Sequence, residues 1–258
     1  MNGWDAPGTA AYYEAFCRRY GRYRRANLEL VSHARIEPGM RVLDLAAGTG
    51  RTAQAALARL GGTGRVVCVE PSASMRVAGA RRVRSSCVTW RAGLPRADRV
   101  FDRVLCGAAI WQIQPIETTL RRLATLLRPG GALCFTIPAV YLQEPDQPGG
   151  GRDPLLLGLP AILARPRRRV ARAAAPLTVA AMAGSLENAG YEPVPWGFRS
   201  RFTQVAYAEW LKIPVVTEGM LAGLPAATRA QMIDDAMRMV DRSSWKWERW
   251  RGWTAWTH

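Results

Sequence analysis

Residues 42–50 read VLDLAAGTG, a short apolar run that ends in a glycine-rich turn. The next residues, RTAQAALARL (51–60), have helical spacing, so the turn opens a helix. Gly48, Gly50 and Ala53 match the G-x-G-x-x-G/A pattern of folds that bind nucleotides, and Glu70 lies where a ribose-binding acid is expected. The stretch predicts a strand, a turn and a helix that hold a ligand with a ribose.

The alternation of strands and helices continues along the chain. Short apolar runs predict strands at 65–69, 87–90, 101–106, 132–136 and about 191–198. Helical spacing predicts helices at 10–34, 73–84, 117–127, about 177–189 and, with a break at 219–225, 204–243. This order predicts a parallel sheet covered on both faces. A chain of 258 residues that is 48% hydrophobic suits one such domain.

The position of Asp44 indicates the charge of the ligand. Asp44 lies inside the first strand, four residues before Gly48. A carboxylate here would repel a pyrophosphate at the following helix N-terminus. The ligand should therefore carry positive charge near the turn.

Four segments together resemble a known family. VLDLAAGTG resembles the first motif of class I S-adenosylmethionine-dependent methyltransferases, whose usual form is VLDxGxGxG. VVCVEPSASM (66–75), FDRVLCGAAIWQI (101–113) and LLRPGGALCFTIP (126–138) resemble later motifs of that family, in family order. The chain looks most similar to its small-molecule members, such as trans-aconitate and quinone-type methyltransferases. A Rossmann-type fold that binds another nucleotide is the alternative.

The resemblance implies an α/β fold with a Rossmann-like seven-stranded sheet. Six strands would be parallel and strand seven antiparallel, with N-terminal helices and a helical insertion between strands six and seven. The implied organisation is a single domain, 1–258. Its expected parts are a helical lid (1–36), a cofactor-binding core (37–142), an irregular excursion (143–176), a helical acceptor cap (202–243) and the C-terminal strand (244–258).

The implied cofactor is S-adenosylmethionine, with S-adenosylhomocysteine as product. The family motifs assign cofactor contacts to Asp44, Ala46, Gly48, Gly50, Glu70, Pro71, Met75, Ala92, Gly93, Leu94, Cys106 and Gly107, and a lid would add Tyr12 and Tyr20. Members close to this chain usually have G-D-A-x-x-L-P after strand three, whereas residues 90–95 read WRAGLP without the acid. Adenine recognition is therefore assigned to backbone groups near 92–94.

The acceptor site is predicted from aromatic residues, namely Tyr13, Trp111, Gln112, Trp245 and Trp247. Trp111 can instead be a packing residue, and the N-terminal tyrosines can be buried in a surface helix. The chain ends in SSWKWERWRGWTAWTH, which holds five of the ten tryptophans. A strand between two helical layers has two buried faces, so these tryptophans are expected to be mainly core. Trp245 and Trp247, at the start of the strand, are expected nearer the acceptor.

No catalytic residue is assigned from the sequence. His33 and His258 are the only histidines, and neither stands at a motif position for a base. This favours an acceptor that is already anionic or nucleophilic, such as a carboxylate, an amine, a phenolate or an activated carbon. Glu144, Asp146 or a tyrosine could serve as the general base, and the sequence does not distinguish between them. No metal is expected.

The charge and cysteine content of the chain indicate what partners and location to expect. The net charge is +16, almost all from arginine, which GC-rich coding or an anionic partner would explain. The basic run at 165–172 can be a solvated face, or can bind a phosphate, a carboxylate or an acidic carrier protein. The five cysteines show no pairing pattern, and the sequence has no signal peptide or membrane-spanning run: Cys17, Cys68, Cys87, Cys106 and Cys134. These features predict a cytoplasmic protein with no membrane partner. A monomer or a homodimer is expected.

The function expected from the sequence is O-, N- or C-methylation of a small molecule, in the specialised metabolism of a GC-rich bacterium. An RNA methyltransferase is the first alternative, but residues 106–109 read CGAA and not the Asn/Asp-Pro-Pro-aromatic form used on base amines. The second alternative is a protein on this fold that binds S-adenosylmethionine and catalyses cyclisation, or only binds.

Overall fold

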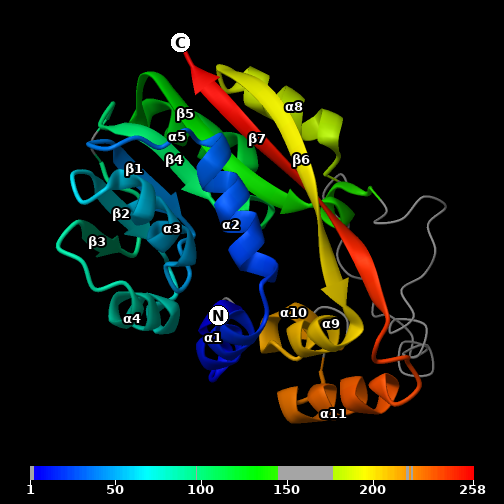
Figure 1. Cartoon of the computed structure of the whole chain (residues 1–258). Helices are drawn as coiled ribbons and strands as arrows, with labels where there is room; N and C mark the ends of the chain where they lie inside the picture. The colour runs from blue at the N-terminus through cyan, green and yellow to red at the C-terminus, as the bar shows by residue number, and fades with distance from the viewer. Residues whose placement is uncertain (1–2, 97, 145–176, 219–220, 222) are drawn as a thin grey trace. The chain divides into compact units, whose positions relative to one another are not determined.

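The computed structural model describes residues 3–96, 98–144, 177–218, 221 and 223–258. Seven strands form one sheet in the order β3-β2-β1-β4-β5-β7-β6 (Figure 1). Their bounds are Arg41–Leu45 (β1), Arg65–Val69 (β2), Val88–Arg91 (β3), Phe101–Cys106 (β4), Leu127–Pro138 (β5), Tyr191–Thr203 (β6) and Trp245–Thr257 (β7). The seven-stranded sheet expected from the sequence is confirmed.

The direction of the strands also agrees with the prediction. β1 pairs in parallel with β2 and β4, β2 with β3, and β4 with β5. β7 is antiparallel to β5, with Phe135 opposite Trp253 and Ala132 opposite Trp256. β7 therefore lies inside the sheet, between β5 and β6, although it follows both in the chain.

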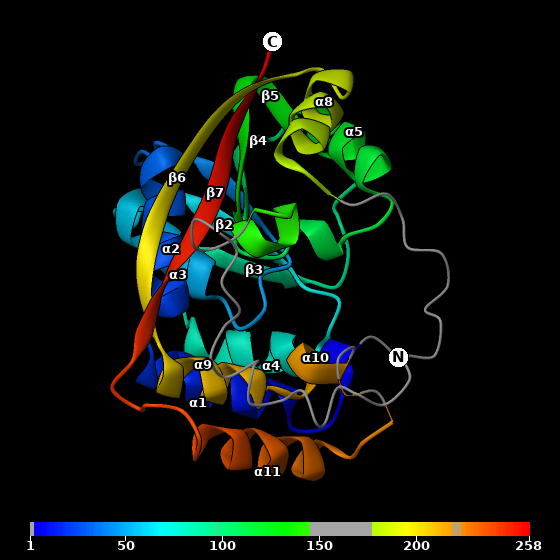
Figure 2. The same cartoon turned by 90° about the vertical axis from the view of Figure 1, so that its right-hand side faces the viewer.

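Two helical layers cover the sheet, because its strands are apolar on both faces. The helices of the described residues are α1 (Thr9–Arg19), α2 (Arg22–His33), α3 (Arg51–Leu60), α4 (Ala73–Arg82), α5 (Ile116–Leu126), α8 (Val179–Asn188), α9 (Gln204–Leu211), α10 (Pro214–Glu218) and α11 (Ala226–Met237), of which α2, α3, α5 and α8 pack on the sheet. Leu30 of α2 and Ala53 of α3 belong to one buried cluster, whereas Leu120 of α5 and Met182 of α8 belong to the other. Figure 2 shows these pairs of helices on opposite faces of the sheet.

The tryptophans of β7 divide along the strand. Trp250 and Trp253 are each 1% exposed, and Trp253 stacks on Phe135 with 5.2 Å between ring centroids. Trp256 is half-buried against the α2 and α3 cluster. The second half of the strand is therefore core, as expected, whereas Trp245 and Trp247 remain 40% and 45% exposed.

By internal contacts the chain forms two compact units, and β6 and β7 contribute residues to both. The sheet unit consists of residues 23–144, 177–198 and 249–258. The described part of the helical unit lies in 3–22 and 199–248, and it contains the short helix η1 (Gly3–Asp5), α1 and α9–α11. The helices predicted within 202–243 are thus present. Asp146 and the basic run at 165–172 lie outside the described residues.

A buried ion pair organises the helical unit. Arg22 and Glu248 approach to 2.6 Å with side chains only 4% and 6% exposed. The Arg22 guanidinium also lies 4.6 Å from the ring centroid of Trp210 and 5.2 Å from that of Phe202. A buried charge needs such a partner, so the pair fixes where the first half of β7 packs.

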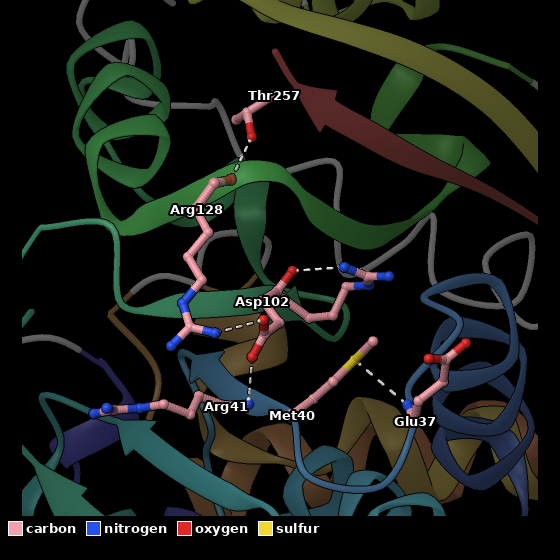
Figure 3. Close-up of polar contacts among 7 residues, drawn as sticks. Glu37, Met40, Arg41, Asp102, Arg128 and Thr257 are labelled. Atoms are coloured by element: carbon pink, nitrogen blue, oxygen red, sulfur yellow. Dashed lines mark hydrogen bonds and ion pairs between the residues drawn. The ribbon is translucent and has the colours of Figure 1, made fainter.

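The amino-terminal edge of the sheet is closed by hydrogen bonds. The Asp102 carboxylate accepts from the backbone N–H of Arg41 at 2.7 Å and from the Arg128 guanidinium at 3.1 Å (Figure 3). The Thr257 hydroxyl donates to the Arg128 carbonyl oxygen at 2.9 Å. One aspartate thus joins the starts of β1, β4 and β5, and Thr257 adds the end of β7.

Two boundaries differ from the sequence prediction. β6 extends to Thr203, beyond the expected 198, because Phe202 is buried in the helical unit and continues the strand through an arginine-rich stretch. β5 begins at Leu127, before the expected 132, because Phe101 pairs with Leu127 ahead of the turn residues. No helix in the part of the chain that the structure describes is long and apolar enough to cross a membrane.

Candidate functional site

The turn after β1 has an unusual backbone. Ala46, Gly48 and Gly50 all have positive φ, at 53°, 55° and 77°. A side chain at Gly50 would collide with Val83 and Trp90, whereas a side chain at Gly48 would meet nothing within 4 Å. Gly48 therefore presents open space to a ligand, while Gly50 is required by close packing. Ala46 stands where the usual family motif has its first glycine.

Glu70 follows β2 and ties this turn to the next helix. Its Oε2 accepts from the Gly48 backbone N–H and its Oε1 from the Ser72 backbone N–H, both at 2.8 Å. Ser72 in turn caps α4 by accepting from the N–H of Met75. Glu70 is 6% exposed. Carboxylate oxygens accept more than one hydrogen bond each, so Glu70 could also receive the two hydroxyls of a ribose.

Asp44 is the most unusual group of the sheet unit. It is fully buried, and neither carboxylate oxygen has a hydrogen-bond partner among the described residues. Burial raises its pKa from 3.8 to about 8; the backbone N–H of Ala53, which lies nearby without hydrogen-bond geometry, opposes the rise and the charge of Glu70 adds to it. A buried acid without a partner costs free energy. Positive charge on a ligand would offset that cost, as expected from the sequence.

The turn after β4 is also closely packed. Ala108 has a φ of 55°, and its N–H donates to the Thr136 hydroxyl at 3.1 Å. A side chain on Gly107 would collide with the Thr52 hydroxyl and the Asn27 amide oxygen, which hydrogen-bond each other at 3.2 Å. Residue 107 must therefore be glycine for α2, α3 and β4 to meet. Burial raises the pKa of the Cys106 thiol, so it is no thiolate nucleophile.

The segment after β3 carries the adenine assignment. Ala92 and Gly93 are exposed and Leu94 is half-buried against the core, and their adenine contact stays a prediction. Met75, assigned to the same contact, is 2% exposed. Sequence reasoning missed Trp90, whose ring lies where side chains at Gly50 and Gly79 would stand. A glycine inside the helical pattern 73–84 was the available sign of this close approach.

An aromatic pair lies beyond the ends of β4 and β5. Trp111 in η2 (Ile110–Gln112) stacks on Tyr141 in η3 (Ala139–Leu142), with 4.6 Å between ring centroids and 21° between planes. Tyr141 is 39% exposed, Gln112 is exposed and Trp111 is half-buried. Both segments follow carboxyl ends of adjacent parallel strands, the edge where ligands of such sheets bind. Tyr141 was not predicted, because no motif marks it.

Glu144 is held in an ion pair. Its carboxylate accepts from the Arg251 guanidinium at 2.7 and 2.8 Å, and Arg249 lies 3.8 Å away. The hydrogen bonds from Arg251 lower the pKa of Glu144; burial opposes them, and the charges of Arg251 and Arg249 lower the pKa further. Glu144 is thus a weak base. His33 stacks on Trp196, with ring centroids 3.9 Å apart.

The remaining predicted residues lie in the helical unit. Tyr12 is 53% exposed, and Tyr13 contacts Trp4 edge to face at 5.9 Å. The Tyr20 hydroxyl is buried, and burial raises its pKa. The lid role of Tyr12 and Tyr20, and the acceptor role of Tyr13, Trp245 and Trp247, stay predictions. No group of three or more metal-ligating side chains occurs among the residues that the structure describes.

Comparison with known proteins finds a similarity that includes the turn, Glu70 and β4. A family model described as a methyltransferase domain matches residues 42–131. This match covers the sheet unit from β1 to the start of β5, about a third of the chain. A demethylmenaquinone methyltransferase of Symbiobacterium thermophilum is 33% identical over 119 residues, which are 43% of this chain and 47% of that protein. The ubiquinone/menaquinone biosynthesis C-methyltransferase UbiE of Rubrivivax gelatinosus is 35% identical over 133 residues, 48% and 51% of the two chains.

Solved structures support the fold of the methyltransferase domain. YcgJ of Bacillus subtilis aligns with a TM-score of 0.61 and 16% identity, over 91% of this chain and 99% of its own. The (4+2)-cyclase SpnF aligns with a TM-score of 0.56 and 17% identity, over 89% and 80%. The matched region spans about half the length of the quinone methyltransferases, 47% and 51% for the two described above.

Proposed function

We propose that this protein transfers the methyl group of S-adenosylmethionine to a small-molecule acceptor and releases S-adenosylhomocysteine. The unpartnered buried carboxylate of Asp44, beside a turn whose Gly48 faces open space, carries the proposal. A ligand with a sulfonium and an ammonium group would supply the positive charge that this carboxylate lacks. Such a ligand contains no phosphate for Asp44 to repel.

Each residue of the turn would have one task in binding. Glu70 would accept the ribose hydroxyls while it holds the Gly48 and Ser72 N–H groups. Gly48 would allow the backbone to approach the ligand, and Asp44 would stabilise the turn or the ligand's amine through charge. Gly107 and Ala108 would form the floor under the methyl group. These tasks agree with the residue types present, because each needs either a carboxylate or a missing side chain.

The acceptor would be planar and apolar. The stacked rings of Trp111 and Tyr141 offer an aromatic surface at the carboxyl edge of the sheet, where stacking with another ring is favourable. The two quinone methyltransferases reported above are named for flat ring acceptors, which supports the same class here. We propose a phenol, a quinol or a related activated ring carbon as acceptor, in bacterial specialised metabolism.

The chemistry requires little from the protein. When bound, S-adenosylmethionine supplies an activated methyl group with a neutral sulfur leaving group. The chain's own residues would orient the acceptor and exclude water. Among the described residues Glu144 is ion-paired, the Cys106 thiol is buried and His33 is stacked on an indole. The acceptor would therefore be nucleophilic before it binds, or the Tyr141 hydroxyl would take its proton while passing its own proton to solvent.

A cyclase that uses the same fold is the second candidate. It is favoured by the likeness to SpnF and by the lack of an evident base among the described residues near the site. Conversion of a substrate without release of S-adenosylhomocysteine would identify this activity. An RNA acceptor is less well supported, because residues 106–109 lack the motif used on base amines.

The first test is a thermal-shift series with S-adenosylmethionine, S-adenosylhomocysteine and NADH. A ligand at about 100 times its dissociation constant adds roughly 2.7 kcal/mol to the free energy of unfolding. For a chain of this length each kcal/mol raises Tm by about 2–4 °C. A shift with the two sulfur ligands alone is expected, and no shift with them would overturn the cofactor assignment.

The acceptor class is tested by release of S-adenosylhomocysteine with a naphthoquinol and with trans-aconitate. We expect turnover with the ring acceptor. Trp111→Ala should raise KM for it by about tenfold, the loss of one favourable ring contact. Tyr141→Phe is the matched control, since it keeps the stacked ring. A fall in kcat for Tyr141→Phe would assign its hydroxyl to proton transfer, and turnover of trans-aconitate alone would exclude a planar acceptor.

A further inference from the structure

The first half of β7 exposes two tryptophans side by side. Trp245 and Trp247 are 40% and 45% exposed, and their rings meet edge to face with centroids 5.2 Å apart. Residues two apart in a strand share a face, so both indoles project from the same side of β7. Neighbouring exposed apolar side chains of this size mark an interaction surface. We call Trp245 and Trp247 the indole patch.

The surroundings of the indole patch are basic. Residues 199–203 and 238–247 contain five basic side chains and one acidic one: Arg199, Arg201, Arg238, Arg242, Lys246 and Asp241. Lys246 projects from the other face of β7 and lies over the Tyr207 ring, and Arg238 pairs with Asp235. The Arg201 guanidinium lies 4.5 Å from the ring centroid of Trp245. Asp241 accepts hydrogen bonds from the N–H and hydroxyl of Ser243, which hold it within its own turn. One guanidinium therefore contacts the indoles, within an arginine-rich segment of a chain whose net charge is +16.

This combination matches a phospholipid surface better than the other partners. Indoles favour the boundary between headgroups and acyl chains, and arginines nearby are attracted to anionic headgroups. A nucleobase would need an open indole face, but Arg201 covers one face of Trp245 and the ring edge of one indole meets the other. A second copy of this chain would bring the same positive charge into contact with itself.

We propose that the indole patch docks this protein on the surface of an anionic phospholipid membrane. Binding would be peripheral, with the indoles at headgroup depth and the arginines on the phosphates. The inference concerns the helical unit alone and does not rest on the proposed function, since vesicle binding needs neither cofactor nor acceptor. It differs from the sequence-based expectation that the protein has no membrane partner, and the vesicle experiment decides between the two.

The test is sedimentation of the full chain with phosphatidylcholine vesicles that contain or lack phosphatidylglycerol. Binding is expected with the anionic vesicles and should weaken as salt is added. Trp245→Ala combined with Trp247→Ala should reduce the partition coefficient by about tenfold or more. Arg201→Gln combined with Arg242→Gln should give a similar loss. Controls are Val194→Ser, which removes an exposed apolar side chain elsewhere, and Arg59→Gln with Arg81→Gln, which remove the same charge.

Brominated phospholipids provide a second readout on the unaltered protein. Bromine on the upper acyl chain should quench part of the tryptophan emission, and the double tryptophan variant should lose that part. Equal binding by this variant and its controls would overturn the proposal. So would dimerisation in lipid-free solution that Trp245 and Trp247 control, or tighter binding of a single-stranded oligonucleotide through them.

Discussion

Asp44 and Asp102 lie in neighbouring parallel strands of one sheet, at opposite ends. Asp102, at the start of β4, has its carboxylate satisfied by the Arg41 N–H and the Arg128 guanidinium. Asp44, near the end of β1, is fully buried with both oxygens unpartnered. The same side chain thus strengthens one edge and weakens the other. The difference indicates that the amino edge is built for stability, whereas the carboxyl edge keeps polar groups available for a ligand.

The backbone repeats this contrast. Ala46 and Ala108, which follow β1 and β4, both have positive φ. A side chain in the left-handed region costs about 1–2 kcal/mol. Such cost is concentrated at sites that bind or react. The carboxyl edge therefore combines strain with an unpartnered buried acid, and variants at each edge can break or sharpen the comparison.

The largest effect is expected at Glu70. Glu70→Ala removes the carboxylate that accepts from the Gly48 and Ser72 N–H groups and that is proposed to bind the ribose hydroxyls. The affinity for S-adenosylmethionine should therefore fall by about 100-fold or more. Calorimetric titration measures it, with circular dichroism to show a folded protein. Gly48→Val should act similarly by filling the open space. Glu37→Ala, at an exposed glutamate, is the control. Binding that survives Glu70→Ala would contradict the site.

Asp44 should make stability depend on pH. Its pKa is 3.8 when unfolded and about 8 when folded, so between these values the folded state keeps a proton that the unfolded state has lost. The free energy of unfolding should therefore fall as pH rises from about 4 to 8, by at most about 1.4 kcal/mol per pH unit, and level off above.

Urea unfolding at pH 5 and pH 8 measures this dependence. Asp44→Asn should lose most of the decline, whereas Asp98→Asn, at an exposed aspartate, should retain it. Binding of a cationic cofactor should release a proton near pH 7, which appears in calorimetry as a dependence on the buffer's ionisation enthalpy. An unchanged decline in Asp44→Asn would show that another group causes it.

Asp102 should affect stability and leave ligand binding unchanged. Asp102→Ala leaves the Arg41 N–H and Arg128 without their acceptor, at a cost of about 1–3 kcal/mol. Thermal unfolding without ligand measures it. Asp98→Ala breaks the exposed Asp98–Arg122 ion pair and should cost at most about 1 kcal/mol. A loss of cofactor affinity in Asp102→Ala would mean that the two edges are coupled.

The smallest effect is expected at Ala46. Ala46→Gly removes the left-handed strain and should stabilise the fold by about 1 kcal/mol, less the entropy that glycine gains on unfolding. Ala47→Gly is the matched variant at the next residue, whose φ is not positive, and it should destabilise. We therefore predict that the two variants change the free energy of unfolding in opposite directions, which chemical denaturation can measure. Destabilisation by both would remove the strain argument.

The fold could be predicted closely because its determinants are local in sequence. The VLDLAAGTG turn, the alternation of apolar strands with helices and the position of Glu70 all lie within short windows. Strand seven was predictable from the family resemblance, and the burial of Trp250 and Trp253 agrees with it.

The rest depends on contacts between distant residues. The pairing of Glu144 with Arg251 joins positions 107 residues apart, and the stacking of Tyr141 on Trp111 joins two short helices that no motif links. The exposure of Trp245 and Trp247 belongs to the part of β7 that lies in the helical unit. The sequence marked these tryptophans, but periodicity alone could not separate the exposed half of β7 from its buried half.

The place of β7 in the sheet has a consequence for biosynthesis. A ribosome makes β6 well before β7, with α9–α11 between them, yet β6 joins the sheet only through β7. Until β7 emerges, β5 and β6 both present unpaired backbone edges, which favour pairing with other chains. Five strands can assemble during translation, whereas the last two must wait for Trp250 and Trp253. Translation that stalls between residues 204 and 244 would therefore leave an aggregation-prone intermediate.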